Sequence, residues 1–347
     1  MMTSMQRVLT AIGQQEPDRV PLFLLTTLHG AKELGLSIRD YYSRAEHVAE
    51  GQLRLLAKYR SDCLYSFFYA SIELEAFGGQ TIFIDDGPPN GGGPVIHCAE
   101  DIDRLSPPRV ADSPGLRRGL ETIRLLKERV GDTVPIIGSV VAPFSLPVLQ
   151  MGFADYIELI YEQPERFARL MAVNQAFCVE WANAQLAAGA TAIGYADPLA
   201  STTNIPRALY LTTGFPVYRE TIGRIKGPVA LHLASGRGLP IADEIVAGGA
   251  AAVGVSALED LADWKSAVGG RITVMGNLNG IEMRRWTSAQ AEAEVKLAIA
   301  RAGRGGGFIL ADNHGEIPWQ VPDEVLLSIR EAVDRWGRYP LDWVAAP

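Results

Sequence analysis

The densest group of chemically active side chains in the sequence follows the apolar residues that open the stretch FILADNHGEIPW. Its first four residues have the composition of a buried strand. Four polar residues then occur within five positions: Asp312, Asn313, His314 and Glu316. Turn formation explains Asp, Asn, Gly and Pro after a strand, but it does not explain His and Glu in the same few residues. Such groups can exchange protons and pair with the donors and acceptors of a small molecule. We therefore interpret the segment as a candidate site, with a purely structural loop as the alternative.

The elements that must position these groups are indicated by eight short apolar runs, most of them rich in Val and Ile. The runs are VPLFLL (20–25), DCLYSFF (62–68), VPIIGSV (134–140), TAIGYAD (191–197), VALHLAS (229–235), AAVGVS (251–256), ITVMGN (272–277) and FILADN (308–313). Runs without strict alternation are typical of strands buried on both faces of a parallel sheet. Helical patterns separate most of them. One is SAQAEAEVKLAIARAG, for which Thr287 or Ser288 is the expected helix cap.

Strands that alternate with helices form βαβ units, and eight such units predict an α/β fold of the (β/α)₈ TIM-barrel type. We expect residues 1–347 to form a single barrel domain. A doubly wound open sheet is the alternative, and the lack of GxGxxG after any run argues against it. Residues 70–130 exceed the length of one helix. The stretch QTIFIDDGPPNGGGPVIH predicts a hairpin within an insertion in the N-terminal third of the barrel.

In barrels of this type the site is formed at the C-terminal ends of the strands. Four further polar residues fall at such ends: Asp197, His232, Asn277 and Asn279. Each also has a structural interpretation. An Asp before Pro often begins a turn, and a lone His in an apolar run is usually bonded to a carbonyl. Asn also favours left-handed turn positions. We predict that these four residues share a pocket with the 312–316 segment.

Composition and charge exclude several classes of protein. The formal net charge is −8, which argues against a nucleic-acid-binding protein because phosphate binding needs a basic face. The three cysteines lack CxxC spacing and predict neither a disulfide framework nor a thiolate metal site. The polar N-terminus lacks the apolar region of a signal peptide, and no apolar run reaches membrane-spanning length. We expect a cytoplasmic protein.

Several motifs resemble those of the uroporphyrinogen decarboxylase superfamily, in the same order along the chain. They are QRVLTAIGQQEPDRVP, GSVVAPFSLPVLQMG, ADPLAS, LHLASG, VMGNLNG and GGGFILADNHGEIPWQVPDEVLLSI. The resemblance runs from about Gln6 to Ala332. It implies a (β/α)₈ barrel and an enzyme. The superfamily contains the decarboxylase itself and a set of cobalamin-dependent methyltransferases.

The decarboxylase pattern includes arginines after the first strand, in a motif of the kind RQAGRY. The equivalent stretch here is LLTTLHGAKELG, which contains no Arg. Several substrate carboxylates without guanidinium partners would be poorly compensated. His314 does match a histidine of the decarboxylase pattern. A decarboxylase or lyase of tetrapyrrole-like acids is therefore an alternative function.

The methyltransferases that act on a thiol such as coenzyme M resemble one another in a zinc site, with His-x-Cys at one strand end and Cys at the last. Zinc holds the thiol as a thiolate at neutral pH. The corresponding positions here are His232, Ala234 and His314, so both cysteines are absent. We therefore expect no metal site. Zinc held by two histidines with Asp312 or Glu316, in a thiol methyltransferase, is the alternative.

The chain is most similar to the branch that methylates tetrahydrofolate. In that branch a methyl group moves from methylcobalamin on a corrinoid protein to N5 of tetrahydrofolate. The acceptor amine is already nucleophilic at neutral pH and needs no metal, but its pterin ring must be held by matched donors and acceptors. The resemblance implies methylcobalamin and tetrahydrofolate as cofactors and a corrinoid-binding protein as partner. A homodimer is compatible with it, and neither nucleic acid nor a membrane is an expected partner.

Roles within that reaction follow from residue type. The pterin-binding candidates are Asp197, Asn277, Asn279, Asp312 and Asn313. The candidates for the N5 proton are His314 and Glu316, with His232 as a second candidate on an adjacent wall. A non-catalytic corrinoid- or pterin-binding protein is the alternative of another class.

Overall fold

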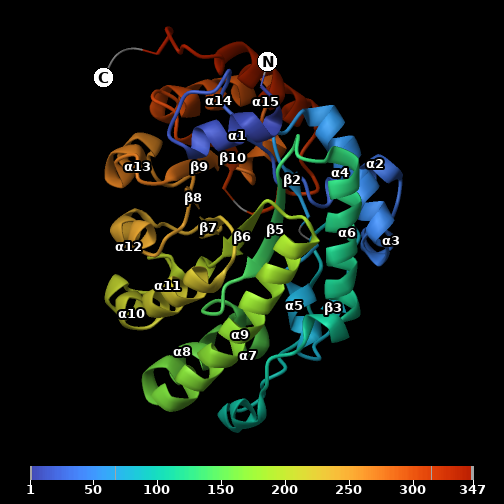
Figure 1. The fold of residues 1–347 in the computed structure, drawn as a ribbon, viewed down its shortest axis with the longest axis vertical. Helices are drawn as coiled ribbons and strands as arrows, with labels where there is room; N and C mark the ends of the chain where they lie inside the picture. The colour runs from blue at the N-terminus through green and yellow to red at the C-terminus, as the bar shows by residue number, and fades with distance from the viewer. Residues whose placement is uncertain (1, 67, 314, 345–347) are drawn as a thin grey trace.

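The structure is a computed structural model that describes residues 2–66, 68–313 and 315–344. Its centre is a parallel eight-stranded sheet, around which helices lie (Figure 1). The strands are β1 Leu22–Phe23, β2 Leu64–Tyr65, β5 Ile136–Val141, β6 Ala192–Ala196, β7 Val229–His232, β8 Ala252–Gly254, β9 Thr273–Leu278 and β10 Phe308–Asp312. Each of the eight apolar runs predicted as strands overlaps one of them, so the prediction of the strands is confirmed.

The strand order is β1-β10-β9-β8-β7-β6-β5-β2, and all seven pairings are parallel. This sequential order is that of a barrel and not of a doubly wound sheet. The sheet curls until β1 and β2 come together. The Asp62 amide donates to the Leu22 carbonyl at 2.6 Å, and the Leu22 amide donates to Asp62 Oδ2 at 2.8 Å. The fold is therefore an α/β curled sheet consistent with a (β/α)₈ barrel.

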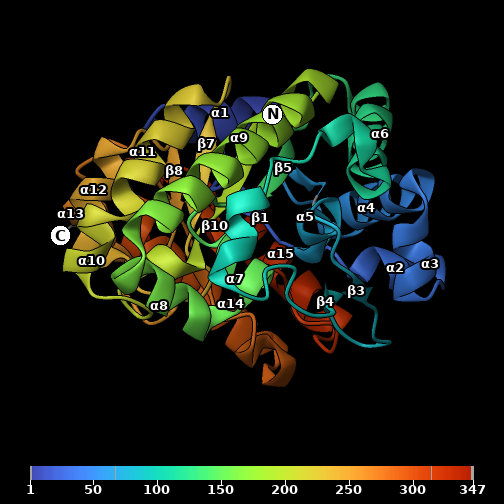
Figure 2. The ribbon, with the colours of Figure 1, turned by 90° about the horizontal axis from the view of Figure 1, so that it is seen from below.

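The helices cover the outside of this sheet (Figures 1 and 2). They are α1 Ser4–Ile12, α2 His29–Leu34, α3 Ile38–Ser43, α4 Ala45–Tyr59, α5 Ser71–Ala76, α6 Pro114–Val130, α7 Leu146–Met151, α8 Phe153–Glu162, α9 Pro164–Ala188, α10 Arg207–Thr212, α11 Gly214–Arg224, α12 Ala242–Ala247, α13 Leu261–Val268, α14 Ser288–Ala302 and α15 Asp323–Trp336. Short 3₁₀ segments are η1 Ala99–Arg104, η2 Val110–Asp112, η3 Pro198–Ala200, η4 Leu239–Ile241 and η5 Glu282–Arg285. The largest apolar cluster lies between the sheet and these helices.

Local sequence explains where the helices begin. Thr287 caps α14 and forms a capping box with Gln290, as its side chain predicts. The long helical pattern before β6 is divided between α8 and α9. The division falls at Pro164, which has no N–H to continue a helix but fits its first position.

Helix α1 crosses the N-terminal ends of the strands and packs Val8 and Ala11 against side chains of the sheet interior. Buried Arg7 on this helix donates to Asp18 and, at 2.6 Å, to Asp62. Asp62 also accepts from Arg19 at 2.8 Å. The charged residues of the N-terminal motif therefore hold α1 and the start of β1 in place.

The segment between α5 and α6 contains a short hairpin outside the main sheet. Strand β3, Thr81–Ile82, pairs antiparallel with β4, Asn90–Gly91, within the stretch for which a hairpin is predicted. That this segment is an insertion remains a prediction. Among the described residues, none of the helices is both long and apolar enough to cross a membrane.

Candidate active site

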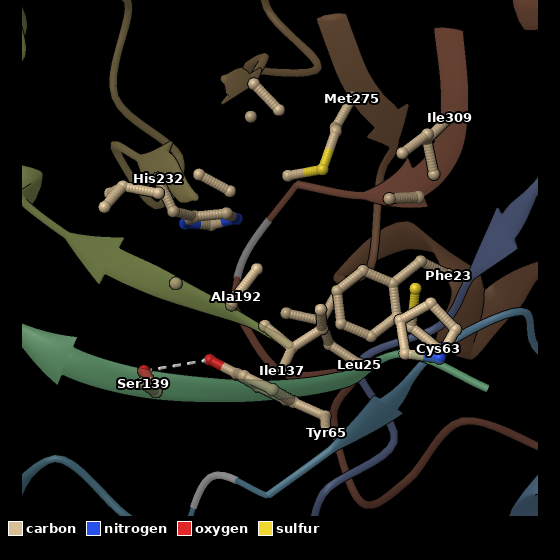
Figure 3. A pocket seen from close by; sticks show the side chains of 18 of the residues that line it. Phe23, Leu25, Cys63, Tyr65, Ile137, Ser139, Ala192, His232, Met275 and Ile309 are labelled. Atoms are coloured by element: carbon tan, nitrogen blue, oxygen red, sulfur yellow. Dashed lines mark hydrogen bonds between the residues drawn. The ribbon is translucent and has the colours of Figure 1, made fainter. Parts of the chain in front are cut away.

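The barrel interior contains a cavity of about 250 Å³. It extends from residues at the C-terminal ends of the strands to residues of α1 that close the opposite end. Most of its lining is apolar, and Figure 3 shows side chains of several strands around it. Three polar candidates of the sequence lie at its C-terminal mouth: His232, Asp312 and Glu316. We call these three residues the mouth.

Glu316 lies in the loop after β10 and accepts a hydrogen bond from the hydroxyl of Thr27, which follows β1. Burial raises the pKa of Glu316 to about 7; the Thr27 hydrogen bond lowers it, and the nearby charge of Asp312 raises it. A carboxyl group that titrates near neutral pH can take up or release a proton under physiological conditions. Glu316 is therefore suited to proton transfer.

Asp312 is the last residue of β10 and is 2% exposed. Its Oδ1 accepts from the Leu25 amide at 3.1 Å, which fixes the carboxylate between β10 and the chain that follows β1. One oxygen of Asp312 is thus engaged by the fold. The residue lines the cavity and also acts on the charge of Glu316.

His232 ends β7, and its ring occupies space that two glycines leave open. A Cβ added at Gly254 would lie 2.8 Å from His232 Cδ2, and one at Gly315 would lie 3.7 Å from Cε1. The Ala234 amide donates to His232 Nδ1 at 3.0 Å, and Ala234 has a φ of 51°. Because Nδ1 is an acceptor, the proton of the neutral ring lies on Nε2. His232 can therefore donate a hydrogen bond from Nε2.

Three further residues, to which the sequence assigns no role in the reaction, contribute to this site: Thr27, Tyr65 and Ser139. Thr27 bonds to Glu316, and the Tyr65 hydroxyl donates to Ser139 Oγ at 3.3 Å in the cavity wall. Thr27 follows the first apolar run, and a polar residue in this position is expected at the site of a barrel. Tyr65 lies within the apolar run DCLYSFF, where nothing distinguishes it from a core aromatic residue.

Asp197 lies behind the cavity wall and not in it. It is fully buried, and its Oδ1 accepts from Ser145 Oγ at 2.6 Å. Burial raises the pKa of Asp197 to about 7, while the Ser145 hydrogen bond lowers it. Its neighbours Ala196 and Pro198 line the cavity. The structure therefore brings Asp197 near the strand ends without bringing it to the mouth.

The asparagine candidates are also separated from the mouth. Asn277 donates to the carbonyls of Ser256 and Glu259, both at 2.9 Å, and Asn279 accepts from two amides of the following turn. Both line a separate hollow beside α14. Asn313 is 2% exposed and follows Asp312 directly. His314 lies outside the described residues.

The charges and ligand types around the cavity limit what it can bind. Among the described lining residues there is no lysine or arginine. The described part of the chain contains no cluster of three or more His, Cys, Asp or Glu residues that could hold a metal ion.

Comparison with known proteins identifies the family. The model of the uroporphyrinogen decarboxylase (URO-D) family matches residues 3–336. The chain belongs to this family. A uroporphyrinogen decarboxylase from Pelobacter propionicus is 30% identical over 264 residues, covering 71% of this chain and 74% of that protein. One from Idiomarina loihiensis is 26% identical and covers 95% and 96% of the two chains.

Solved structures show the same fold. A methyltransferase from Methanosarcina mazei superposes with a TM-score of 0.83 at 20% identity, covering 96% of this chain and 99% of that one. A B12-independent methionine synthase from Shewanella sp. W3-18-1 superposes with a TM-score of 0.55 at 14% identity, over 92% and 95% of the two chains. The predicted superfamily is thus confirmed, and the family is one of enzymes.

Proposed function

We propose that this protein transfers a methyl group from methylcobalamin, carried by a corrinoid protein, to N5 of tetrahydrofolate, without zinc. The observation that carries the proposal is the mouth itself. At the mouth, Glu316, whose pKa is raised to about 7, lies near Asp312 and His232. The described lining of the cavity contains no lysine or arginine. The fold shared with a methyltransferase from Methanosarcina mazei supports it.

The residues of the mouth have distinct roles in this proposal. Methylcobalamin supplies the methyl group when its carrier protein presents it. Glu316, as the carboxylate, accepts the proton that N5 must lose once it carries the methyl group. His232 donates from Nε2, and Asp312 accepts N–H groups of the pterin with its carboxylate. His314, two residues before Glu316 in the sequence, remains the other candidate for the N5 proton.

The hydrogen bond between Ala234 and His232 supports a reaction without zinc. A histidine binds a metal ion through an unprotonated ring nitrogen. In neutral His232 the Nδ1 lone pair accepts from the Ala234 amide at 3.0 Å, so the proton lies on Nε2. Metal binding would require this ring to give up its backbone hydrogen bond or its proton. Zinc-dependent methylation of a thiol is therefore the less favoured alternative.

Decarboxylation is the second candidate function, because the curated relatives named above are uroporphyrinogen decarboxylases. A substrate with many carboxylates needs cationic partners to offset the cost of their burial. The described lining of the cavity includes no lysine or arginine. This difference in charge makes methyl transfer the better-supported function.

The test is incubation of the protein with methylcobalamin and tetrahydrofolate, followed by mass spectrometric detection of 5-methyltetrahydrofolate. We expect product with the wild type and much slower formation with Glu316→Gln. The matched control is Glu128→Gln, which changes an exposed glutamate of α6. Release of CO₂ from uroporphyrinogen without any methylated folate would instead establish the decarboxylase. Methylation of coenzyme M that depends on added zinc would establish the thiol reaction.

A further inference from the structure

In the central strands, the residues that face the barrel interior are more exposed than the residues that face the helices. In β6, Ala192, Gly194 and Ala196 are partly exposed, whereas Ile193 and Tyr195 between them are fully buried. The partly exposed residues line the cavity. In a packed barrel, layers of bulky branched side chains fill the interior. The interior face of β6 is therefore open, and the face toward the helices forms the core.

Neighbouring strands show the same use of small residues. Ala230 of β7 is partly exposed toward the cavity, and Ala252 and Gly254 of β8 line it. The larger side chains come from the other side of the barrel, where Figure 3 shows Phe23 and Met275 facing the cavity. The empty space thus lies against β6, β7 and β8. We call this space, below the mouth and above α1, the chamber.

The floor of the chamber is also apolar. Met5, Val8 and Ile12 of α1 line its N-terminal end. The walls between floor and mouth carry few polar groups, and the Tyr65 hydroxyl is already bonded to Ser139. Water in such a space finds few hydrogen-bond partners, whereas an apolar molecule loses nothing by entering.

We propose that the chamber binds the flat apolar ring system of a small neutral molecule, with the remainder of that molecule directed toward the mouth. An apolar cavity of about 150 Å³ holds benzene, which has six heavy atoms. By the same proportion the whole cavity of about 250 Å³, chamber and mouth together, accommodates about ten heavy atoms, the size of two fused aromatic rings. A charged group cannot occupy the chamber, because its charge would be buried without a partner. This inference rests on the lining alone and does not depend on the proposed methyl transfer.

The test uses indole as the probe and calorimetry as the measurement. Benzimidazole serves as the matched polar probe, because it has the same size and shape but carries one more ring nitrogen to desolvate. We expect indole to bind the wild-type protein, and benzimidazole to bind at least about tenfold more weakly. Failure of indole to bind, or equal binding of the two probes, would overturn the proposal.

Substitutions that fill the chamber locate the binding site. Ala192→Leu and Ala230→Leu place side chains in the space and should weaken indole binding at least tenfold. Ala293→Leu, on the exposed face of α14, adds the same atoms outside the barrel and should leave binding unchanged. Binding that is equal in all three variants would place the probe elsewhere and contradict the proposal.

A smaller change keeps the test valid if the leucine variants do not fold. A Cβ added at Gly194 would meet no atom closer than 3.5 Å, so Gly194→Ala fits without displacing its neighbours. Circular dichroism verifies its folding. We expect this variant to weaken indole binding measurably, about threefold or more, because the added methyl group takes up part of the ligand's space. Unchanged indole affinity in a folded Gly194→Ala would count against the chamber.

Discussion

Glu316 and Thr27 are 289 residues apart in the sequence, and their hydrogen bond exists only because β10 and β1 are neighbours. The sequence identifies Glu316 as a candidate because several polar residues lie close to it in the segment after β10. It does not show that the side chain is partly buried near Asp312 or that its pKa is raised to about 7. Burial and partners of this kind follow from tertiary packing, which no local pattern encodes.

The first prediction concerns the pH dependence of the proposed reaction. Glu316 can accept a proton only when it is a carboxylate. The fraction of Glu316 in this form grows as pH rises through its pKa of about 7. The wild-type rate of methyl transfer in single turnovers should therefore rise between about pH 5.5 and 8.5. Glu316→Gln should be slower by about 10²-fold or more and lose this rise. Parallel pH profiles of the two proteins would exclude Glu316 as the acceptor.

Thr27 provides a second and finer test of the same group. Its hydroxyl donates to Glu316 and lowers the carboxyl pKa relative to burial alone. Thr27→Val keeps the side-chain shape and removes this donor, so the pKa of Glu316 should move upward. The rise in the rate of methyl transfer should then shift to higher pH. A shift to lower pH would mean that Thr27 does not act as the donor.

The third prediction concerns the space that holds His232. A Cβ at Gly254 would lie only 2.8 Å from His232 Cδ2, so Gly254→Ala must displace the ring. The hydrogen bond from the Ala234 amide to Nδ1 should therefore weaken. Nuclear magnetic resonance of the imidazole should then show a changed Nδ1 chemical shift. An unchanged Nδ1 shift in this variant would show that the ring does not depend on Gly254.

At the scale of elements, the sequence predicts well what depends on neighbouring residues. The eight apolar runs overlap the eight strands, and Thr287 caps α14. The sequence predicts poorly the direction in which a side chain projects from the end of a strand. Asn277 lies near the end of β9 and Asn279 directly follows it, yet their side chains bond to nearby backbone groups and line the hollow beside α14. One further position along a strand end changes the side from which a side chain projects.

The fourth prediction concerns the contact between α1, β1 and β2. Asp62 is 1% exposed and binds the guanidinium groups of Arg7 and Arg19. Asp62→Asn would leave these cations without their buried partner, which costs about 3–5 kcal/mol of unfolding free energy. Urea denaturation measures this loss. The control Asp132→Asn removes an exposed ion pair with Lys127, which water and salt screen, and should cost far less. Equal losses in both variants would refute the structural role of Asp62.

At the scale of the whole molecule, two buried carboxyl groups and one partly buried carboxyl group couple folding to pH. Burial raises the pKa of Glu73 to about 8, and the pKa of both Asp197 and Glu316 to about 7. Each group is easier to protonate in the folded chain than in the unfolded one. The stability they contribute is complete below their ordinary pKa values and is lost as pH rises through the folded values. The free energy of unfolding should therefore fall between about pH 4 and 8 on their account.

The fifth prediction isolates one of these groups. Glu73 is 3% exposed, and its Oε1 accepts from the Val141 amide at 2.8 Å. Glu73→Gln keeps this acceptor and removes the ionisation. The variant should match the wild type near pH 5 and exceed it by about 1 kcal/mol or more at pH 8.5. Urea denaturation at the two pH values gives the comparison. A variant that is less stable at pH 8.5 would contradict the raised pKa.

The open barrel interior also determines how the protein should respond to compression. A space of 250 Å³ in each molecule corresponds to about 150 mL/mol, which is larger than most volume changes of unfolding. Unfolding lets water occupy that space, so hydrostatic pressure should favour the unfolded chain strongly. Ala192→Leu, which occupies part of the space, should then raise the pressure at which half of the molecules unfold. Tryptophan fluorescence under pressure would follow the transition directly.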